Sequence, residues 1–161
     1  MLCTAKRVLD GTEYTDLTKN GRKIKRWRLD NPNEEAIIYK AGWLRHPSTQ
    51  WVMKSAYNYI WLYKHMMALN DEYKLRYNHT KDHLAVEKLG DLLRQPPKNI
   101  NLKAIGTDAT PAMPDECIVP GDSVASYRKY YIMKKVRFAT WKAPSKMPDW
   151  FKEGVENVNN I

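Results

Sequence analysis

The stretch that decides the fold is TQWVMKSAYNYIWLYKHMMALNDEYKLRYN, residues 49–78. No glycine occurs between Trp43 and Leu89, and Pro47 is the one proline in that interval. Ser48, which directly follows this proline, is a residue type that caps helix N-termini. These features predict one long helix over residues 49–78, about 45 Å in length.

An apolar stripe runs along this predicted helix. Its members recur at steps of three and four residues: Val52, Ala56, Tyr59, Ile60, Tyr63, Met66 and Met67. Residues at this spacing share one face of a helix, so we expect the stripe to face the core.

Beside the stripe, a second line of residues repeats every seven positions: Trp51, Asn58, His65, Glu72 and His79. The line drifts by about 20° per heptad, so its polar members occupy a half-buried border. An acid, an amide and a histidine on such a border would suit the wall of a cleft. The alternative interpretation is a solvated flank with ordinary ion pairs, such as Glu72 with Arg76.

The other elements are expected on both sides of this helix. They are a helix over 1–10, a basic loop or hairpin over 11–33, a helix over 82–95, a long loop over 96–121 and a helix over 122–142. We expect Trp150 and Phe151 to dock before a frayed end. At 161 residues the chain fits one domain. The predicted fold is mainly α, a compact single-domain helical bundle over 1–150 with long irregular loops and a tail over 151–161.

Composition narrows the function classes. Lys and Arg number 27 against 18 acids, a net charge of +9, which favours a polyanionic partner such as nucleic acid. The 43% hydrophobic content excludes a disordered chain. No apolar run approaches the roughly 18 residues of a membrane span, and the N-terminus is too polar for a signal peptide, so we expect a cytoplasmic protein without membrane contact.

Several chemistries lack their sequence signatures. Cys3 and Cys117 are too few for a disulfide framework and have no zinc-type spacing. No P-loop, Rossmann, nucleophile-elbow or HExxH motif occurs. We therefore expect neither a metal nor another cofactor.

Cations and aromatic residues form two groups that suit DNA. The first group is a segment with five cations in seven residues, Arg22, Lys23, Lys25, Arg26 and Arg28 around Ile24 and Trp27. The second is an aromatic stripe on the third helix, Tyr127, Tyr131 and Phe138, bordered by Arg128 and Lys135. Such a stripe is usually core, but aromatic faces beside cations also stack bases and hold phosphates.

The order of several motifs resembles a family of small phage and bacterial proteins grouped with pyrimidine-dimer DNA glycosylases. The residues that carry the resemblance are His46-Pro47, Trp51, Asn58-Tyr59-x-Trp61-Leu62, Glu72-Tyr73-x-x-Arg76-Tyr77, His83, Pro96-Pro97-x-Asn99-Ile100, Ala112-Met113-Pro114 and Asp122-x-Val124-Ala125-x-Tyr127-Arg128-x-Tyr130-Tyr131. The similarity covers roughly residues 1–150 and extends to phage-restricting members that remove glucosylated hydroxymethylcytosine.

The resemblance implies a helical enzyme that cuts the N-glycosidic bond of an abnormal pyrimidine and leaves an abasic site. Family members carry a Lys-Met and a Glu upstream of the stretch that matches Met1–Ala5, and the pyrimidine-dimer enzymes use an N-terminal amine with a nearby Glu. The residues around Met1 do not reproduce that pair. We therefore expect water-dependent, monofunctional excision rather than a lyase step through an imine.

The residue roles follow from this reading. Glu72 or Asp122 would assist water or the sugar cation, Asn58 would orient, and Asp108 and Asp115 in the long loop are alternatives. Asp122 has a second interpretation as a helix-capping carboxylate. The expected base pocket comprises Trp61, Tyr127, Tyr131, His65 and His83. The expected phosphate contacts are Arg22, Lys23, Lys25, Arg26, Arg28, Arg76, Arg128 and Lys135.

The expected partner is double-stranded DNA, best matched by phage DNA, bound by a monomer acting in anti-phage defence. Two other functions stay open. One is a helical ribonuclease toxin, because Arg76 and His83 have the Arg-x6-His spacing of such enzymes. The other is a non-catalytic DNA-binding protein, in which the heptad line would be only a surface.

Overall fold

The computed structural model describes residues 1–159, and within them the fold is mainly α, as predicted. The helices are α1 (Leu2–Asp10), α2 (Pro32–Ile37), α3 (Pro47–Val52), α4 (Ala56–Tyr77), α5 (Leu84–Arg94), α6 (Ser123–Tyr130) and α7 (Asp149–Asn159). Strands β1 (Thr12–Leu17) and β2 (Lys23–Arg28) form an antiparallel hairpin with Thr12 opposite Arg28. A 3-10 turn (Asp115–Cys117) precedes α6, and a π-helical segment (Tyr131–Lys135) follows it.

The predicted long helix is divided into α3 and α4, so its prediction as one rod is wrong. The Ser55 hydroxyl accepts a hydrogen bond from the Asn58 backbone N–H at 3.2 Å, which caps a new helix. The Ala56 N–H donates to the Asn101 carbonyl at 3.1 Å instead of continuing α3. Trp51 therefore belongs to a different helix from Asn58, and the heptad line begins at Asn58.

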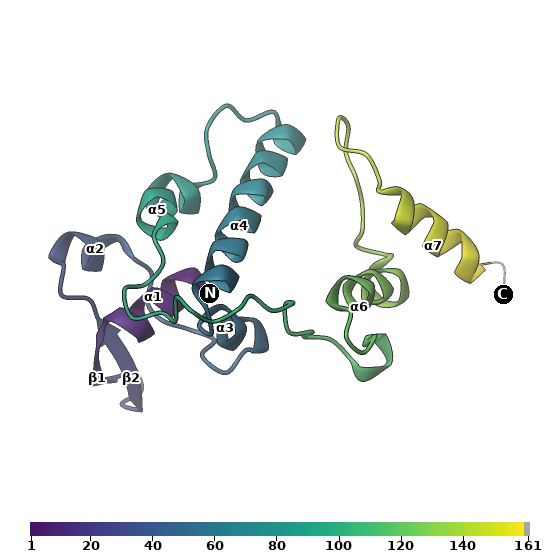
Figure 1. The fold of residues 1–161 in the computed structure, drawn as a ribbon. Coiled ribbons are helices and arrows are strands. Elements are labelled where there is room, and N and C mark those ends of the chain that lie inside the picture. Colours follow the sequence, from purple (N-terminus) through teal and green to yellow (C-terminus); the bar gives the residue numbers. More distant parts are fainter. Residues whose placement is uncertain (160–161) are drawn as a thin grey trace.

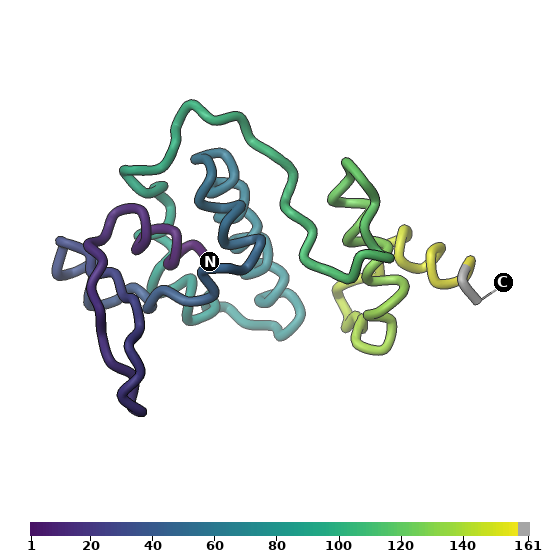
Figure 2. Tube along the Cα trace, turned by 90° about the horizontal axis from the view of Figure 1, so that it is seen from below, coloured from purple at the N-terminus to yellow at the C-terminus, as the bar shows by residue number. Residues whose placement is uncertain are grey.

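The elements gather in two lobes, which Figures 1 and 2 show from two directions. The N-terminal lobe, residues 1–101, contains the hairpin and α1–α5. The C-terminal lobe, residues 115–159, contains α6, the π-helical segment and α7. The linker, residues 102–114, runs between them as an extended green trace in Figure 2. A site located between the lobes would therefore be lined by residues of both lobes.

The N-terminal lobe holds the hydrophobic core. Its buried members are Leu2, Ala5, Trp51, Val52, Tyr59, Leu89, Leu93 and Ile100. Ala56, Tyr63 and Met66 pack against this cluster, which confirms most of the predicted stripe. Ile60, which is 39% exposed, and Met67, which is not among the residues packed against the cluster, are the exceptions.

Arg7 ties three elements of this lobe together from a buried position on α1. Its guanidinium donates to the carboxylate of Glu35 at 2.7 Å and to the backbone carbonyls of Trp27, Ile38 and Tyr39. Burial by itself would raise the pKa of the Glu35 carboxyl, but hydrogen bonds from Arg7 and from the Leu29 N–H outweigh it and lower that pKa.

The C-terminal lobe buries much less. Its buried residues among those described are Cys117, Ser126 and Phe151. Phe151 packs against Trp141 and Trp150, with ring centroids 5.0 and 5.6 Å away. The docked aromatics were predicted correctly, but the frayed tail was not, because residues 149–159 form α7 and the boundary at 150/151 falls inside that helix. The third helix also turns at residues 136–138, before the predicted end at 142.

None of the helices within residues 1–159 is long and apolar enough to cross a membrane.

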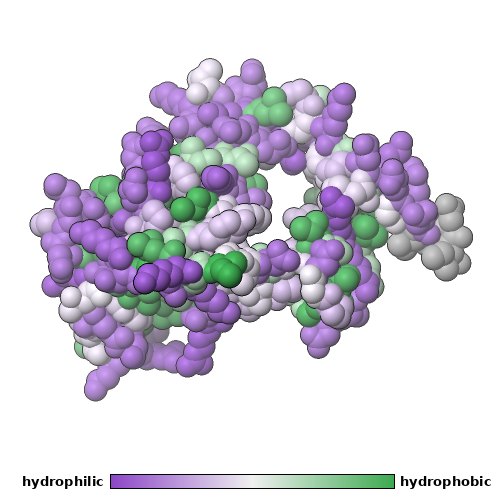
Figure 3. Space-filling model, in the orientation of Figure 1, coloured by the Kyte–Doolittle hydropathy of each residue, from purple (hydrophilic) through white to green (hydrophobic). Residues whose placement is uncertain are grey.

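The space-filling view in Figure 3 shows an opening between the lobes, with hydrophobic residues on both sides of it.

Candidate functional site

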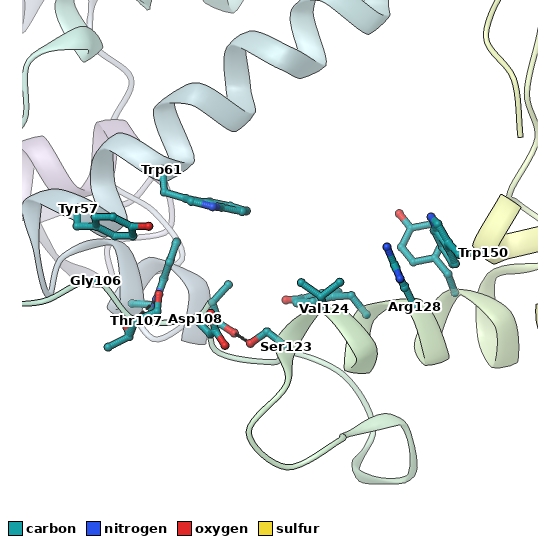
Figure 4. A pocket seen from close by; sticks show the side chains of 13 residues that line it. Tyr57, Trp61, Gly106, Thr107, Asp108, Ser123, Val124, Arg128 and Trp150 are labelled. Atoms are coloured by element: carbon teal, nitrogen blue, oxygen red, sulfur yellow. Dashed lines mark hydrogen bonds between the residues drawn. The ribbon is translucent and has the colours of Figure 1, made fainter. Parts of the chain in front are cut away.

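A pocket of about 460 Å³ lies where the two lobes face each other. It is lined by Trp51, Tyr57, Trp61, Gly106, Thr107, Asp108, Ala109, Ser123, Val124, Tyr127, Arg128, Tyr131 and Trp150. Figure 4 shows Trp61 on the side of α4 and Arg128 with Trp150 on the opposite side, across open space. The lining thus combines aromatic faces with very few charges.

The wall from the N-terminal lobe is a series of aromatic rings. Trp51 is buried, and its ring meets that of Trp61 edge-on, with centroids 5.6 Å apart. Trp61 in turn stacks on His65 at 5.4 Å with an angle of 14° between the planes. Trp61 is 45% exposed, so part of its indole is available to the pocket that it lines.

Asn58 holds the pocket loop in place and is fully buried. Its amide donates to the Trp51 carbonyl at 2.9 Å and to the Thr107 hydroxyl at 3.3 Å, and its side-chain oxygen accepts the Thr107 N–H at 3.0 Å. The Trp51 indole N–H donates to the Thr107 carbonyl at 3.0 Å. Asn58 therefore orients Asp108, the next residue of the loop, instead of facing the pocket itself.

The wall from the C-terminal lobe comes from α6, the first residue of the π-helical segment and the start of α7. Arg128 lies over the Trp150 ring at 5.4 Å, a cation–π contact that keeps the guanidinium at the pocket. The Ser123 hydroxyl donates to the Ala109 carbonyl, which joins the start of α6 to the linker. Tyr127 and Tyr131 line this wall, so the structure brings them together with Trp61 as predicted.

Two charged side chains line the pocket. Among its described lining residues, Asp108 carries the one carboxylate and Arg128 the one cation. A single acid in an otherwise aromatic, partly closed site can stabilise positive charge that develops on a bound group. A guanidinium at the same mouth can hold a phosphate.

The two acids favoured from sequence lie elsewhere. Neither Glu72 nor Asp122 lines this pocket. The Asp122 carboxylate accepts the Ala125 N–H at 2.8 Å and caps α6, which is its second predicted interpretation. Asp115 opens the 3-10 turn and also lies outside the pocket lining.

Glu72 instead joins the two lobes near the C-terminal end of α4. Its carboxylate accepts hydrogen bonds from Arg76 on the same helix and from the Ser145 hydroxyl of the C-terminal lobe, the latter at 2.7 Å. These hydrogen bonds lower the pKa of Glu72. Arg76 also donates to the Thr140 carbonyl at 3.4 Å, so the pair forms a clasp between lobes.

His65 and His83, which were predicted for the base pocket, both lie outside its lining. His65 supports Trp61 from behind and is not itself among the residues that line the pocket. His83 accepts the Ala85 N–H at 3.2 Å, caps α5 and packs edge-on against Tyr73. Since Arg76 pairs with Glu72 and His83 caps a helix, the ribonuclease alternative gains no support from their geometry.

The hairpin cations lie away from the pocket. In Figures 1 and 2 the hairpin extends from the side of the N-terminal lobe opposite the C-terminal lobe. Lys25 pairs with Glu13 at 2.8 Å, and Arg28 lies over the Tyr14 ring at 4.9 Å. Arg26 is half-buried, whereas Arg22 and Lys23 are exposed. Any DNA contact made here is separate from the pocket.

A second basic region was only partly recognised from sequence. Residues 128–146 contain seven Lys or Arg and no Asp or Glu. The predicted contacts Arg128 and Lys135 belong to this basic segment, and Lys135 lies over the Tyr130 and Phe138 rings at 5.2 and 5.8 Å. It begins at the pocket, which makes it the nearer candidate for phosphate binding.

Sequence reasoning missed several lining residues, namely Tyr57, Thr107, Ser123 and Trp150 as a pocket residue. The one available signal was the length of the loop over 96–121, because long loops in compact domains are often functional. Comparison of the chain with known protein families, curated proteins and solved structures found no match.

Proposed function

We propose that the protein is a DNA glycosylase that excises a modified or damaged pyrimidine, with glucosylated 5-hydroxymethylcytosine of phage DNA as the preferred substrate. The observation that carries the proposal is the aromatic pocket with one carboxylate, Asp108, and one cation, Arg128. The resemblance of the motif order to glycosylases supplies the substrate class. Such an enzyme would act as a monomer in the cytoplasm, and its role would be anti-phage defence.

The pocket suits an extruded base. A nucleotide turned out of the duplex needs flat apolar surfaces for its base, and Trp61, Tyr127 and Tyr131 provide them. A pocket of about 460 Å³ leaves room for a base that carries a bulky substituent. The basic segment, residues 128–146, would hold phosphates beside the extruded nucleotide.

The chemistry assigned to Asp108 is hydrolysis of the N-glycosidic bond. The bond between C1′ and the base nitrogen breaks, its electron pair leaves with the base, and positive charge develops on the sugar. The Asp108 carboxylate stabilises that charge and accepts a proton from the water whose oxygen adds to C1′. That proton then passes to the departing base, which neutralises the base and restores the carboxylate. The products are the free base and an abasic sugar.

Closure of the lobes would complete the site. The opening between them leaves the pocket in contact with water, and catalysis on a sugar cation benefits when water is restricted. We include in the proposal that the lobes close on bound DNA into the compact bundle that the sequence predicts.

The test is base release from defined DNA. Duplexes with glucosylated hydroxymethylcytosine, duplexes with a pyrimidine dimer, unmodified DNA and RNA are incubated with the protein, and free base and alkali-labile sites are measured. We expect release from one modified duplex only, and no release by Asp108→Asn, which keeps the shape of the side chain. The matched controls Glu72→Gln and Asp122→Asn should stay active.

Two outcomes would contradict the proposed function, and a third would change its catalytic residue. Tight DNA binding without release on every substrate would favour the non-catalytic DNA-binding protein. RNA cleavage that is lost in His83→Ala would favour the ribonuclease. Full activity of Asp108→Asn together with an inactive Glu72→Gln would keep the glycosylase but move its carboxylate to α4.

A further inference from the structure

The rim loop, residues 102–106, presents apolar side chains to solvent at the edge of the pocket. Ile105 is 88% exposed and Leu102 is 75% exposed. Single exposed apolar residues are ordinary on protein surfaces. These two differ because they lie on a short loop that leads directly into the pocket lining, which begins at Gly106.

The loop is held at both ends. At its start the Asn101 carbonyl accepts the Ala56 N–H at 3.1 Å, and the Asn101 side chain accepts the N–H groups of Lys103 and Ala104, both at 3.0 Å. At its end the Thr107 N–H donates to buried Asn58 at 3.0 Å. The exposed tip is therefore presented by a fixed base.

Gly106 fixes the path of the loop next to Ile105. A side chain at position 106 would collide with the Tyr57 ring, so the backbone lies directly against that ring. Tyr57 itself lines the pocket. The exposed Ile105 directly precedes Gly106 and lies three residues before Asp108, a stretch of chain that spans at most about 10 Å.

We propose that Ile105 is a positioning residue that enters the DNA base stack and fills the space left by the extruded base. This inference rests on the proposed function and names how its substrate is opened. Aliphatic side chains that insert between base steps unstack and kink duplex DNA, and Ile is one of the residue types that do so. Lys103, an exposed cation on the same loop, suits an adjacent phosphate.

Ile105→Ala tests this assignment, and the melting temperature should not change because the side chain is exposed. The matched control is Leu84→Ala on α5, where Leu84 is 55% exposed and lies outside the pocket lining. A duplex carries glucosylated hydroxymethylcytosine with 2-aminopurine as its 3′ neighbour, so that unstacking raises fluorescence. Excision is measured in parallel on this duplex and on the same modified strand without its complement.

We expect Ile105→Ala to lose the fluorescence rise and at least tenfold of duplex excision, and to excise from the single strand at the wild-type rate. Ile105→Met, which keeps an aliphatic wedge, should restore both. Leu84→Ala should match the wild type in every measurement.

The outcomes separate the wedge from the glycosylase. If Ile105→Ala and the wild type excise equally from the duplex, the wedge is wrong and the glycosylase stands. If the wild type raises fluorescence through Ile105 but releases no base, the wedge stands and the proposed function fails. If the wild type leaves the fluorescence of the duplex unchanged, the wedge is wrong.

Discussion

The two lobes build opposite walls of one pocket but are stabilised by different means. The N-terminal lobe buries eight apolar residues in one cluster and adds the buried Arg7, whose guanidinium donates to five acceptor atoms. In the C-terminal lobe the described residues bury only Cys117, Ser126 and Phe151. Because local stability follows buried apolar contact, the wall carried by α6 should open before the wall carried by α4.

Because of this difference, the residues on the two walls of the pocket depend on different parts of the fold for their positions. Trp61 and Asp108 are placed by the core and by Asn58, so their geometry depends on folding of the N-terminal lobe. Tyr131 and Arg128 are placed by the C-terminal lobe, which buries far fewer residues. Under the proposed function, a well-packed platform facing a less stable wall would suit an enzyme that closes on its substrate.

The largest expected effect comes from removing the centre of the weaker lobe. Phe151→Ala removes the ring between Trp141 and Trp150 and should cost about 3–5 kcal/mol. Hydrogen exchange should show faster amide exchange in α6 and α7, and unchanged protection in α4. Phe138→Ala, at a 61% exposed ring of the same lobe, is the control. Equal loss of protection in α4 would mean that the lobes unfold as one unit.

The next effect is expected in the stronger lobe. Arg7→Met removes the guanidinium that donates to the Glu35 carboxylate and to the backbone carbonyls of Trp27, Ile38 and Tyr39, which should cost about 3 kcal/mol in urea unfolding. Because Arg7 helps to lower the pKa of Glu35, the stabilisation is present above the unfolded-state pKa and is lost as pH falls through the lowered folded-state pKa.

Acidification should therefore destabilise the wild type more than Arg7→Met. The control is Arg22→Met, which changes an exposed arginine in the hairpin turn. Identical unfolding of Arg7→Met and the wild type would show that the buried guanidinium does not anchor the lobe.

A smaller effect tests the fixed wall of the pocket. Trp61→Ala removes a stacking face and should raise the activation free energy of base release by about 1–3 kcal/mol. This change lowers kcat/KM roughly 5- to 150-fold. DNA affinity and the melting temperature should change little, because Trp61 is 45% exposed and the residues proposed to contact phosphates are unchanged. Trp43→Ala, at an 82% exposed tryptophan outside the pocket lining, is the control. Unfolding of Trp61→Ala would place this ring in the core instead.

The smallest effect concerns the clasp between the lobes. Hydrogen bonds from Arg76 and Ser145 lower the pKa of Glu72, so the clasp is complete above the ordinary glutamate pKa and weakens as pH falls through the lowered value. Small-angle scattering should show the wild-type protein expanding slightly in that acidic window. Glu72→Gln should give a radius of gyration without this pH dependence. An equal expansion in both proteins would rule the clasp out.

The elements themselves were largely predictable because they depend on neighbouring residues. The helix over 1–10, the hairpin within 11–33 and the helix over 82–95 follow from local periodicity and from Gly and Pro breakers. The break at Ser55 was missed because Asn101, a residue 45 positions away, accepts the N–H that would have continued α3. Helix propensity carries no signal of such a contact.

The residues of the site also differ in whether local sequence or long-range contacts determine their position. Trp61, Tyr127 and Tyr131 were found because aromatic stripes beside cations are visible in the sequence. Glu72 was preferred over Asp108 because it lies on the heptad line of a predicted helix, and Asp122 because it was expected at the start of a helix. Asp108 lies in a loop without period, and its place in the pocket depends on the bonds of Thr107 to Asn58 and Trp51.

What the sequence by itself determined is the helices near residues 1–10 and 82–95, the hairpin, the positive charge that favours a polyanion, and the aromatic residues available for stacking. These are properties of composition and of short-range order along the chain. What only the tertiary structure decided is the division into two lobes, the choice of Asp108 as the pocket carboxylate and the clasp role of Glu72. The physical reason is that each depends on contacts between residues 49 to 73 positions apart, such as Asn58 with Thr107 and Glu72 with Ser145, which local spacing does not specify.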